Sequence, residues 1–176
     1  MYIRNIDHLI KYKPLFLRSI VYSILLSHSV RHDCKLISFV EERKRYTVIL
    51  GSRVKRIYPD EQSLQGVFNK MLRSLRAESL TRKKIHPGVF IYNGDFVTLL
   101  KEERKRENMY VEEGYMRTIP KLCREFTIVV PFIHSFTRKE RDIMKRYNYR
   151  PLKIGLDKLY PDQLIAVLNF LGDREG

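Results

Sequence analysis

The stretch TIVVPFIHSFTRKE, residues 127–140, predicts a buried strand, then a loop, then a charged helix. In an open α/β sheet, ligands bind outside the carboxyl ends of the strands, so this loop is a candidate binding site. Such a loop usually contains glycine, because glycine lets the backbone approach a ligand closely. Here the turn is Pro131-Phe132-Ile133. Three interpretations are open: a ligand-binding loop, a binding loop that has lost its ligand, and a packed corner.

Strands and helices alternate on both sides of this stretch. Apolar residues at helical spacing predict helices near residues 15–29, 60–75 (capped by Asp60), 95–106, 137–147 and 159–171. Other apolar runs predict strands at residues 34–40, 89–92, 109–111, 127–130 and 152–154. Two β-rich runs around Gly51-Ser52 predict a hairpin over residues 46–58, followed later by a loop at 76–88. The order indicates an α/β fold with a mostly parallel sheet, covered on both faces, and an antiparallel hairpin at one edge.

Length and composition indicate one globular domain, residues 1–176, with enough apolar residues for a buried core. The longest apolar run, residues 19–27, is too short to span a bilayer, and the N-terminal stretch lacks a signal-peptide pattern. We therefore expect a cytoplasmic protein with no membrane partner. The two cysteines form no disulfide framework and the five histidines show no ligand spacing, so we expect no metal.

The charge of the chain is one-sided. Thirty-four Lys and Arg residues oppose twenty Asp and Glu residues, which gives a net charge of +14. A basic surface concentrates polyanions and releases their counterions on binding, so nucleic acid is the expected partner. The alternatives are an anionic membrane surface and a salt-bridge-rich surface of the kind that heat-adapted proteins carry.

The segment SHSVRHD, residues 27–33, follows the first long helix and contains His28, Arg31 and Asp33, while Arg18 lies on that helix. One interpretation is an RNA-facing cluster in which arginine binds phosphates. The other is an Arg–Asp ion pair that stabilises the helix end, and the sequence leaves both open. A Ser–His–Asp nucleophile is disfavoured, because nucleophilic chemistry needs an oriented base within reach.

A second basic cluster surrounds the predicted hairpin. Strand alternation places Arg53 and Lys55 on one face, and Arg56 follows them. Such a hairpin suits an RNA backbone, although charges on an edge strand also prevent aggregation. We favour RNA, because the runs at residues 82–84 and 104–106 are also basic. Some tyrosines could stack on unpaired bases, while most are expected to be partly buried: Tyr46, Tyr58, Tyr92, Tyr110 and Tyr115.

The C-terminal stretch LKIGLDKLYPDQLIAVLNFLGD, residues 152–173, carries a strand that ends at Gly155 and an apolar helix that begins near Pro161. Asp162, at the start of this helix, suits the helix dipole. The helix is too apolar to face solvent, so it packs either in the core or against a second subunit.

Four stretches in this order resemble the archaeal tRNA pseudouridine-54 N1-methyltransferases of the SPOUT (trefoil-knot) superfamily. They are LLSHSVRHD (25–33), YPDEQSLQGVFNKML (58–72), IHPGVFIYNGDFVTLL (85–100) and LKIGLDKLYPDQLIAVLNFLGDR (152–174). The resemblance implies a SPOUT-like α/β fold with a C-terminal trefoil knot, a homodimer, and S-adenosylmethionine as cofactor. It implies methylation of N1 of a pseudouridine in the T-arm of tRNA. The sulfonium methyl is already activated, so the chemistry needs alignment and a proton acceptor rather than a metal.

The resemblance also implies roles for particular residues. The expected catalytic residues are Asp33 and Asp162. The expected RNA-binding residues are Arg18, His28 and Arg31, with the hairpin cations Arg53, Lys55 and Arg56. The expected cofactor-binding residues are Val130, Pro131, Phe132, Leu152, Ile154, Gly155, Leu156 and Leu159.

This chain departs from the family pattern at several positions. The Gly-Asp-His of the first cofactor loop is replaced by Pro131-Phe132-Ile133, and Asp-His-Cys near the last helix by Asp162-Gln163-Leu164. An Arg-x-Asp before the first helix appears as Lys13-Pro14-Leu15, and a following Asp as Tyr22. The leading hypothesis is therefore a tRNA methyltransferase. The alternatives are a non-catalytic RNA-binding paralogue that no longer binds cofactor, and a dimeric scaffold.

Overall fold

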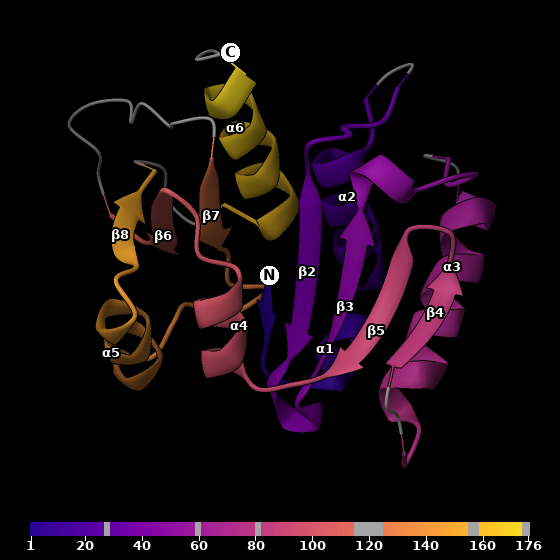
Figure 1. Ribbon diagram of the computed structural model, residues 1–176, viewed down its shortest axis with the longest axis horizontal. Helices are drawn as coiled ribbons and strands as arrows, with labels where there is room; N and C mark the ends of the chain where they lie inside the picture. The colour runs from indigo at the N-terminus through magenta and orange to yellow at the C-terminus, as the bar shows by residue number, and fades with distance from the viewer. Residues whose placement is uncertain (27–28, 59–60, 80–81, 115–124, 155–158, 174–176) are drawn as a thin grey trace.

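The computed structural model describes residues 1–26, 29–58, 61–79, 82–114, 125–154 and 159–173 (Figure 1). The N-terminal part contains β1 (Tyr2–Ile3), α1 (Ile6–Lys11), α2 (Lys13–Ile24), β2 (Lys35–Val40), η1 (Glu41–Arg43), β3 (Arg45–Leu50), η2 (Gly51–Arg53) and α3 (Glu61–Arg76). It is followed by β4 (Arg82–His86), β5 (Val89–Asn93), α4 (Phe96–Glu102), β6 (Glu107–Glu112), β7 (Phe126–Val129), α5 (Arg138–Arg146), β8 (Arg150–Lys153) and α6 (Pro161–Asp173).

Within the described residues the strands form a five-stranded sheet, order β1-β2-β3-β5-β4, and a three-stranded sheet, order β7-β6-β8. The two sheets are joined, because Tyr2 N donates to Val130 O (2.8 Å) and Phe132 N donates to Tyr2 O (3.0 Å). Strands β6, β7 and β8 are parallel to one another, as are β1 and β2, and the Tyr2–Pro131 bridge is parallel too. Strands β3, β5 and β4 pair antiparallel. The mixed α/β fold with a parallel-rich sheet is therefore confirmed.

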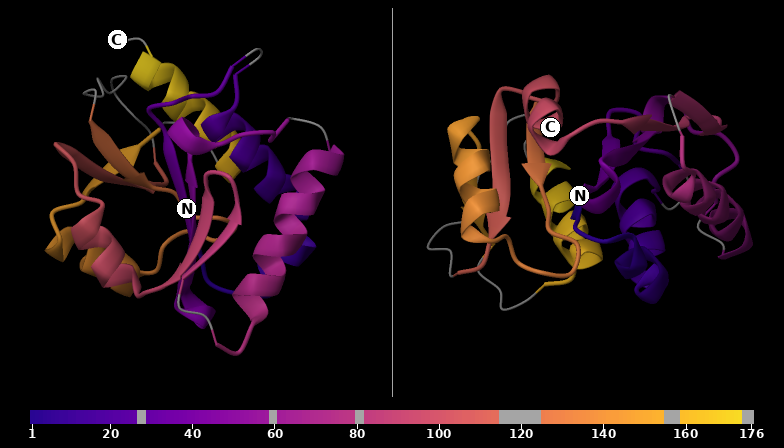
Figure 2. Two further views of the ribbon diagram at one scale, coloured as in Figure 1. Left: turned by 45° about the vertical axis from the view of Figure 1, so that its right-hand side comes forward. Right: turned by 90° about the horizontal axis from the view of Figure 1, so that it is seen from below.

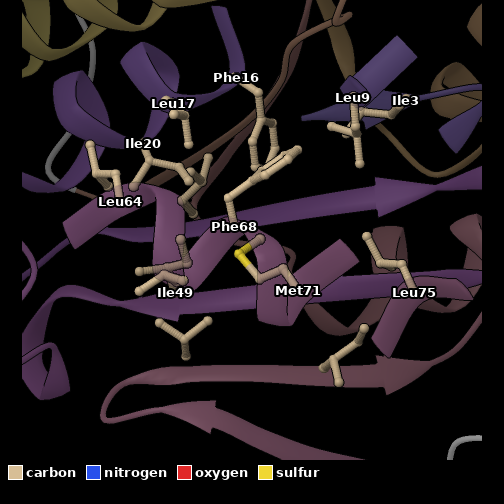
Figure 3. Close-up of a cluster of buried hydrophobic side chains, with 14 of the residues drawn as sticks. Ile3, Leu9, Phe16, Leu17, Ile20, Ile49, Leu64, Phe68, Met71 and Leu75 are labelled. Carbon is tan, nitrogen blue, oxygen red and sulfur yellow. The ribbon is translucent and has the colours of Figure 1, made fainter. Parts of the chain in front are cut away.

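Helices α1, α2 and α3 lie on one face of the five-stranded sheet (Figures 1 and 2). The apolar stripe of α3 recurs at three- and four-residue spacing, so it faces the sheet and packs with α2 and β3 (Figure 3). The predicted stripe residues in this core are Leu64, Val67, Phe68, Met71 and Leu75.

The three-stranded sheet is covered on both faces. Leu164 and Leu168 of α6 pack against β6 and β8 on one side, whereas Met144 of α5 and Leu100 of α4 pack with Tyr110 on the other. Helix α6 also packs along α2. The sequence predicted a sheet with helices on both faces. That prediction holds for the three-stranded parallel sheet, whereas α1, α2 and α3 all lie on one face of the five-stranded sheet.

The hairpin predicted over residues 46–58 is wrong. β3 ends at Leu50, and Gly51 begins a 3-10 turn packed against the loop before β2, where a Cβ on Gly51 would lie 1.8 Å from Arg31 O. The run after the turn cannot pair with β3, since β2 and β5 already occupy its two edges. The antiparallel strand at the sheet edge is β4, within the predicted loop 76–88. The first three residues of β4 are charged and exposed, so the strand lacks the apolar alternation from which strands are predicted.

Two helix boundaries also differ from prediction. α2 ends at Ile24 rather than residue 29, because Arg31 N donates to Ile24 O (2.8 Å) and Leu25 bridges to Val30. α4 ends at Glu102 rather than residue 106. The predicted Asp60 cap lies outside the described residues.

In the described part of the chain, no helix combines the length and apolar character needed to cross a bilayer. In the same residues, no three His, Cys, Asp or Glu side chains gather closely enough to hold a metal ion together.

Candidate functional site

A cavity of about 740 Å³ lies at the carboxyl ends of the three parallel strands β6, β7 and β8. This is the position at which open α/β sheets bind ligands. Its wall is formed by the segments that follow the strands and by the start of α6: Val111, Glu112, Glu113, Pro131, Phe132, Ile133, His134, Ser135, Phe136, Arg141, Lys153, Ile154, Leu159, Tyr160, Pro161 and Leu164.

The loop after β7 is both a packed corner and a cavity wall. Phe132 is 2% exposed and packs edge-on against Phe16 of α2, with ring centroids 6.1 Å apart. Phe136 is also buried and packs against Tyr110 and Tyr2. Two aromatic side chains therefore anchor the loop in the core. Between them, the segment at residues 133–135 faces the cavity.

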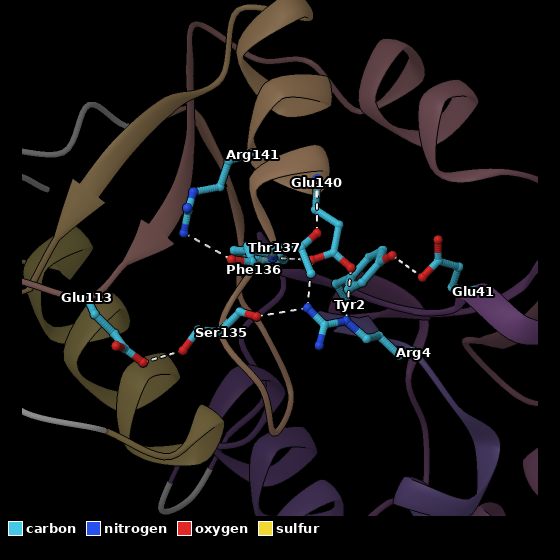
Figure 4. A network of polar contacts seen from close by, with 9 residues as sticks. All are labelled: Tyr2, Arg4, Glu41, Glu113, Ser135, Phe136, Thr137, Glu140 and Arg141. Carbon is cyan, nitrogen blue, oxygen red and sulfur yellow. Dashed lines mark hydrogen bonds and ion pairs between the residues drawn. The ribbon is translucent and has the colours of Figure 1, made fainter.

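Charged groups hold the same loop from outside (Figure 4). The Arg4 guanidinium donates to both carboxylate oxygens of Glu140 (2.9 and 2.7 Å) and to Ser135 O (2.8 Å). Thr137 and Glu140 form a capping box at the start of α5. Burial raises the pKa of Glu140, but the hydrogen bonds from Arg4 and Thr137 outweigh it and keep that pKa below its ordinary value. No local pattern in the sequence marks Arg4 for this role, because its partners lie more than a hundred residues away.

Two carboxylates that the sequence analysis missed line the cavity. Glu112 lies 3.6 Å from Arg141 Nε, and Glu113 accepts a hydrogen bond from Ser135 Oγ. Both directly follow the strand predicted at residues 109–111, and this position at a strand end is a signal that could have identified them. The cavity therefore combines acceptors with an apolar wall.

The expected cofactor-binding residues separate into three groups. Pro131, Phe132, Ile154 and Leu159 line the cavity. Val130 and Leu152 are buried in the apolar core behind it. The remaining two, Gly155 and Leu156, lie outside the described residues.

The two expected catalytic carboxylates do not meet in one site. Asp162 is 5% exposed; its Oδ2 accepts a hydrogen bond from Arg18 Nε (2.7 Å). Its Oδ1 is buried and has no hydrogen-bond partner among the described residues. Asp33 is exposed and lines a second cavity of about 400 Å³ at the junction of the two sheets. Tyr2 and Phe96 line the same cavity.

The expected RNA-binding residue Arg31 is engaged inside the protein. Its two terminal nitrogens each lie 2.7 Å from an oxygen of Asp173, at the end of α6, and its side chain is 15% exposed. The hydrogen bonds from Arg31 lower the pKa of Asp173. An ion pair at the helix end was the alternative interpretation, but with Asp33 as the partner. The pair with Asp173 instead ties the loop after α2 to α6.

The basic segment after β3, residues 53–56, is different. Arg53, Lys55 and Arg56 are exposed and form no ion pair with any described residue. They lie in η2 and the irregular segment that follows it, not on a strand, and Arg56 has a positive φ of 56°. His28, the remaining expected RNA-binding residue, lies outside the described residues.

Arg45, the first residue of β3, is a cation that does not face solvent. Its side chain is buried and donates to the carbonyl oxygens of Ser74 (3.2 Å) and Leu75 (2.9 Å), and also to those of Ala77 and Glu78. The first two carbonyls belong to the last turn of α3, where they have no partners within the helix, and the other two to the segment that directly follows it. Arg45 therefore caps α3.

Comparisons with known proteins agree with this architecture. A family profile described as "Putative SAM-dependent RNA methyltransferase" matches residues 14–176. The tRNA (pseudouridine(54)-N(1))-methyltransferase of Methanococcoides burtonii is 26% identical over 174 residues, covering 89% of this chain and 80% of the relative. The protein of the same name from Methanopyrus kandleri is 26% identical over 159 residues, covering 88% and 76%. The resemblance deduced from the sequence is thus confirmed, and the chain belongs to the family of SAM-dependent RNA methyltransferases.

Proposed function

We propose that this protein transfers the methyl group of S-adenosylmethionine to N1 of a pseudouridine in the T-arm of tRNA. One observation carries the proposal: most of the chain aligns with two relatives that are named tRNA (pseudouridine(54)-N(1))-methyltransferases. The cavity of about 740 Å³ at the parallel strand ends supports it. Fold likeness alone does not establish chemistry, so the residues of the cavity must also suit the methyl donor.

The cavity residues fit such a donor in volume and in chemistry. About 740 Å³ is within the range of cofactor sites, roughly 300–1,000 Å³. Ile154, Leu159 and Phe132 provide an apolar wall for an adenine ring. The carboxylate of Glu112 is an acceptor for ribose hydroxyls or an ammonium group. Residues 131–133 contain no glycine, unlike the family's Gly-Asp-His. The donor would therefore contact the side chains of this loop as well as its backbone.

The proposed reaction is a direct displacement. S-adenosylmethionine supplies an activated methyl group, whose bond to sulfur breaks as the bond to N1 forms. The N1 proton must then leave, and a carboxylate in the cavity is the appropriate acceptor. We assign this role to Glu113, oriented by the hydroxyl of Ser135. Asp33 lies at the other cavity, and Asp162 is held by Arg18, so in this proposal Asp162 positions the start of α6.

The wider architecture is part of the same proposal. We propose a single SPOUT-like domain with a C-terminal trefoil knot, as the family resemblance implies. We also propose a cytoplasmic homodimer. Tyr22 and Leu26 on the α2 side and Phe170 on α6 are large, exposed apolar side chains, and they suit a subunit interface. Arg53, Lys55 and Arg56 would bind RNA phosphates, because their charges are not engaged by described carboxylates.

Two measurements test the function. Calorimetry with S-adenosylmethionine reports donor binding. Transfer of labelled methyl groups to a tRNA transcript that carries pseudouridine or uridine at position 54 reports the chemistry. We expect donor binding, and labelling of the pseudouridine transcript alone. Glu113→Gln should bind the donor like the wild type and slow methyl transfer by about a hundredfold or more, the usual contribution of a general base.

A second candidate function, a non-catalytic RNA-binding paralogue, is favoured by one observation. The Gly-Asp-His loop of the family is replaced by Pro131-Phe132-Ile133, and Phe132 is buried against α2. The absence of heat and of thermal stabilisation with donor, together with salt-sensitive tRNA binding, would establish this candidate instead.

A further inference from the structure

One face of β4 and β5 carries rings and cations in register. Arg82 lies opposite Tyr92 and Lys84 opposite Phe90. Because strand side chains alternate between faces, these four point to the same side of the sheet. The adjoining apolar residues Val89, Ile91 and Ile85 point to the other side and pack in the main core. We call the surface formed by Arg82, Lys84, Phe90 and Tyr92 the open sheet face.

No described helix covers this surface. α1, α2 and α3 pack on the opposite face (Figures 1 and 2). α4 lies on the same side, but Phe96 packs over Phe39 of β2. Phe90 and Tyr92 are half-buried and belong to no apolar core cluster of the described residues, while Arg82 and Lys84 are exposed.

The rings and cations of this face are already arranged for stacking. The Arg82 guanidinium carbon lies 5.3 Å from the Tyr92 ring centroid and 5.7 Å from that of Phe90. Tyr92 also stacks on Tyr46 of β3, with centroids 5.3 Å apart and ring planes 18° apart. Arg82 therefore already lies over the rings of this face, as a cation attracted by aromatic surfaces does.

The strands that carry the open sheet face supply only positive charges. Residues 82–94 contain Arg82, Lys83 and Lys84 and no carboxylate. The basic segment at residues 53–56 adjoins the same strands, since His86 Nε2 donates to Lys55 O (2.7 Å). A Cβ on Gly88, between β4 and β5, would lie 2.5 Å from Val54 N. The exposed cations of residues 53–56 and the half-buried rings of the open sheet face therefore adjoin the same two strands.

We propose that the open sheet face binds unpaired nucleotides of the RNA substrate, with bases stacked on Phe90 and Tyr92 and phosphates held by Arg82 and Lys84. This combination of rings and cations suits single strands, because stacking needs bases that are free of a duplex. A duplex offers phosphates but no exposed base face along its length. This inference rests on the proposed function in one respect: the proposed function identifies RNA as the partner.

The test uses the full-length chain and a double variant, Phe90→Leu with Tyr92→Leu, which retains apolar bulk and removes the rings. We expect its affinity for a labelled single-stranded oligoribonucleotide, measured by fluorescence anisotropy, to fall about 5- to 150-fold, the range for losing one stacked base. A matched control is Tyr147→Leu. Tyr147 also lies beneath a cation, Lys101 Nζ at 5.4 Å from the ring centroid, but in the other half of the molecule.

Four outcomes decide the inference. An unchanged affinity in the double variant, or an equal loss in the Tyr147 control, overturns it. Equal competition by a duplex of the same length also overturns it. Crosslinking of 4-thiouridine RNA to the peptide that contains residues 82–92 supports it. Calorimetry with S-adenosylmethionine separates this inference from the proposed function: failure of donor binding in the wild type removes the methyltransferase, whereas the oligonucleotide results stand or fall by themselves.

Discussion

The cations around the β6–β8 cavity and those on the β4 side of the molecule have opposite environments. Near the cavity, Arg4 binds Glu140, Arg18 binds Asp162, and Arg141 lies beside Glu112. On the β4 side, Arg82 and Lys84 form no ion pair with a described carboxylate. The first group stabilises loops and helix ends, while the second remains available to a polyanion.

The difference shows that net charge and local charge carry separate information. A charge of +14 indicates an anionic partner but does not locate it. An arginine that already holds a carboxylate gains less from a phosphate, because the first bond must be broken. Two of the expected RNA-binding residues, Arg18 and Arg31, are engaged in this way. The predictions that follow test whether pairing separates structural cations from binding cations.

The largest expected effect concerns Arg45. Arg45→Met keeps the apolar stem but leaves the carbonyls at the end of α3 without their donor, and should lower the free energy of unfolding by about 2–4 kcal/mol. Urea denaturation measures the change. Arg43→Met, at an exposed position of η1, should stay within about 0.5 kcal/mol of the wild type. Equal effects of the two substitutions would contradict the capping role.

The second prediction concerns Arg4, which positions the cavity loop from β1. Arg4→Gln removes the paired contact with Glu140, and should weaken S-adenosylmethionine binding about tenfold by calorimetry, or about 1.4 kcal/mol. The control is Arg138→Gln, on the same helix as Glu140, where the side chain is 92% exposed. Wild-type affinity in the Arg4 variant would show that the loop keeps its position without this contact.

The third prediction is a pH dependence. The pKa of Glu140 is held below its ordinary 4.5, and that of Asp173 below its ordinary 3.8. The unfolded chain therefore binds protons more readily than the folded one, so this stabilisation is present above the ordinary values and is lost as the pH falls through the lowered ones. Urea midpoints between about pH 6 and 3 should fall less steeply in Arg4→Gln and Arg31→Gln. Parallel profiles in all three proteins would refute the assignment.

The smallest expected effect compares free and paired cations directly. Replacing Arg53 and Lys55 together by Ala should reduce the salt dependence of tRNA affinity by about one unit of slope per lost phosphate contact. Arg31→Ala should leave that slope unchanged and instead lower stability, because Arg31 holds Asp173. If the slope changed only in the Arg31 variant, Arg31 would be the phosphate-binding cation and Arg53 and Lys55 would not.

The fold class could be predicted because it depends on local patterns. The stripe of α3 and the strands at residues 34–40 and 127–130 repeat with the periods of helix and strand, and the structure contains all three elements. The prediction of a hairpin at residues 46–58 was wrong for a non-local reason. Strands β2 and β5 occupy both edges of β3, so the residues after Gly51 have no edge of β3 to pair with. β4 was missed because the outward side of an edge strand can be charged.

The sequence by itself determined that this is a basic α/β protein, that its candidate binding loops follow its parallel strands, and which family it resembles. These properties reside in composition, in short periodic patterns and in the order of motifs. Tertiary structure alone decided the partner of each charge, because the Arg18–Asp162 and Arg31–Asp173 pairs join residues 144 and 142 positions apart. It also decided that the loop at residues 131–133 both packs in the core and lines a cavity, since Phe16 comes from a distant helix. Contacts of this kind depend on which surfaces meet after folding, and no local pattern records them.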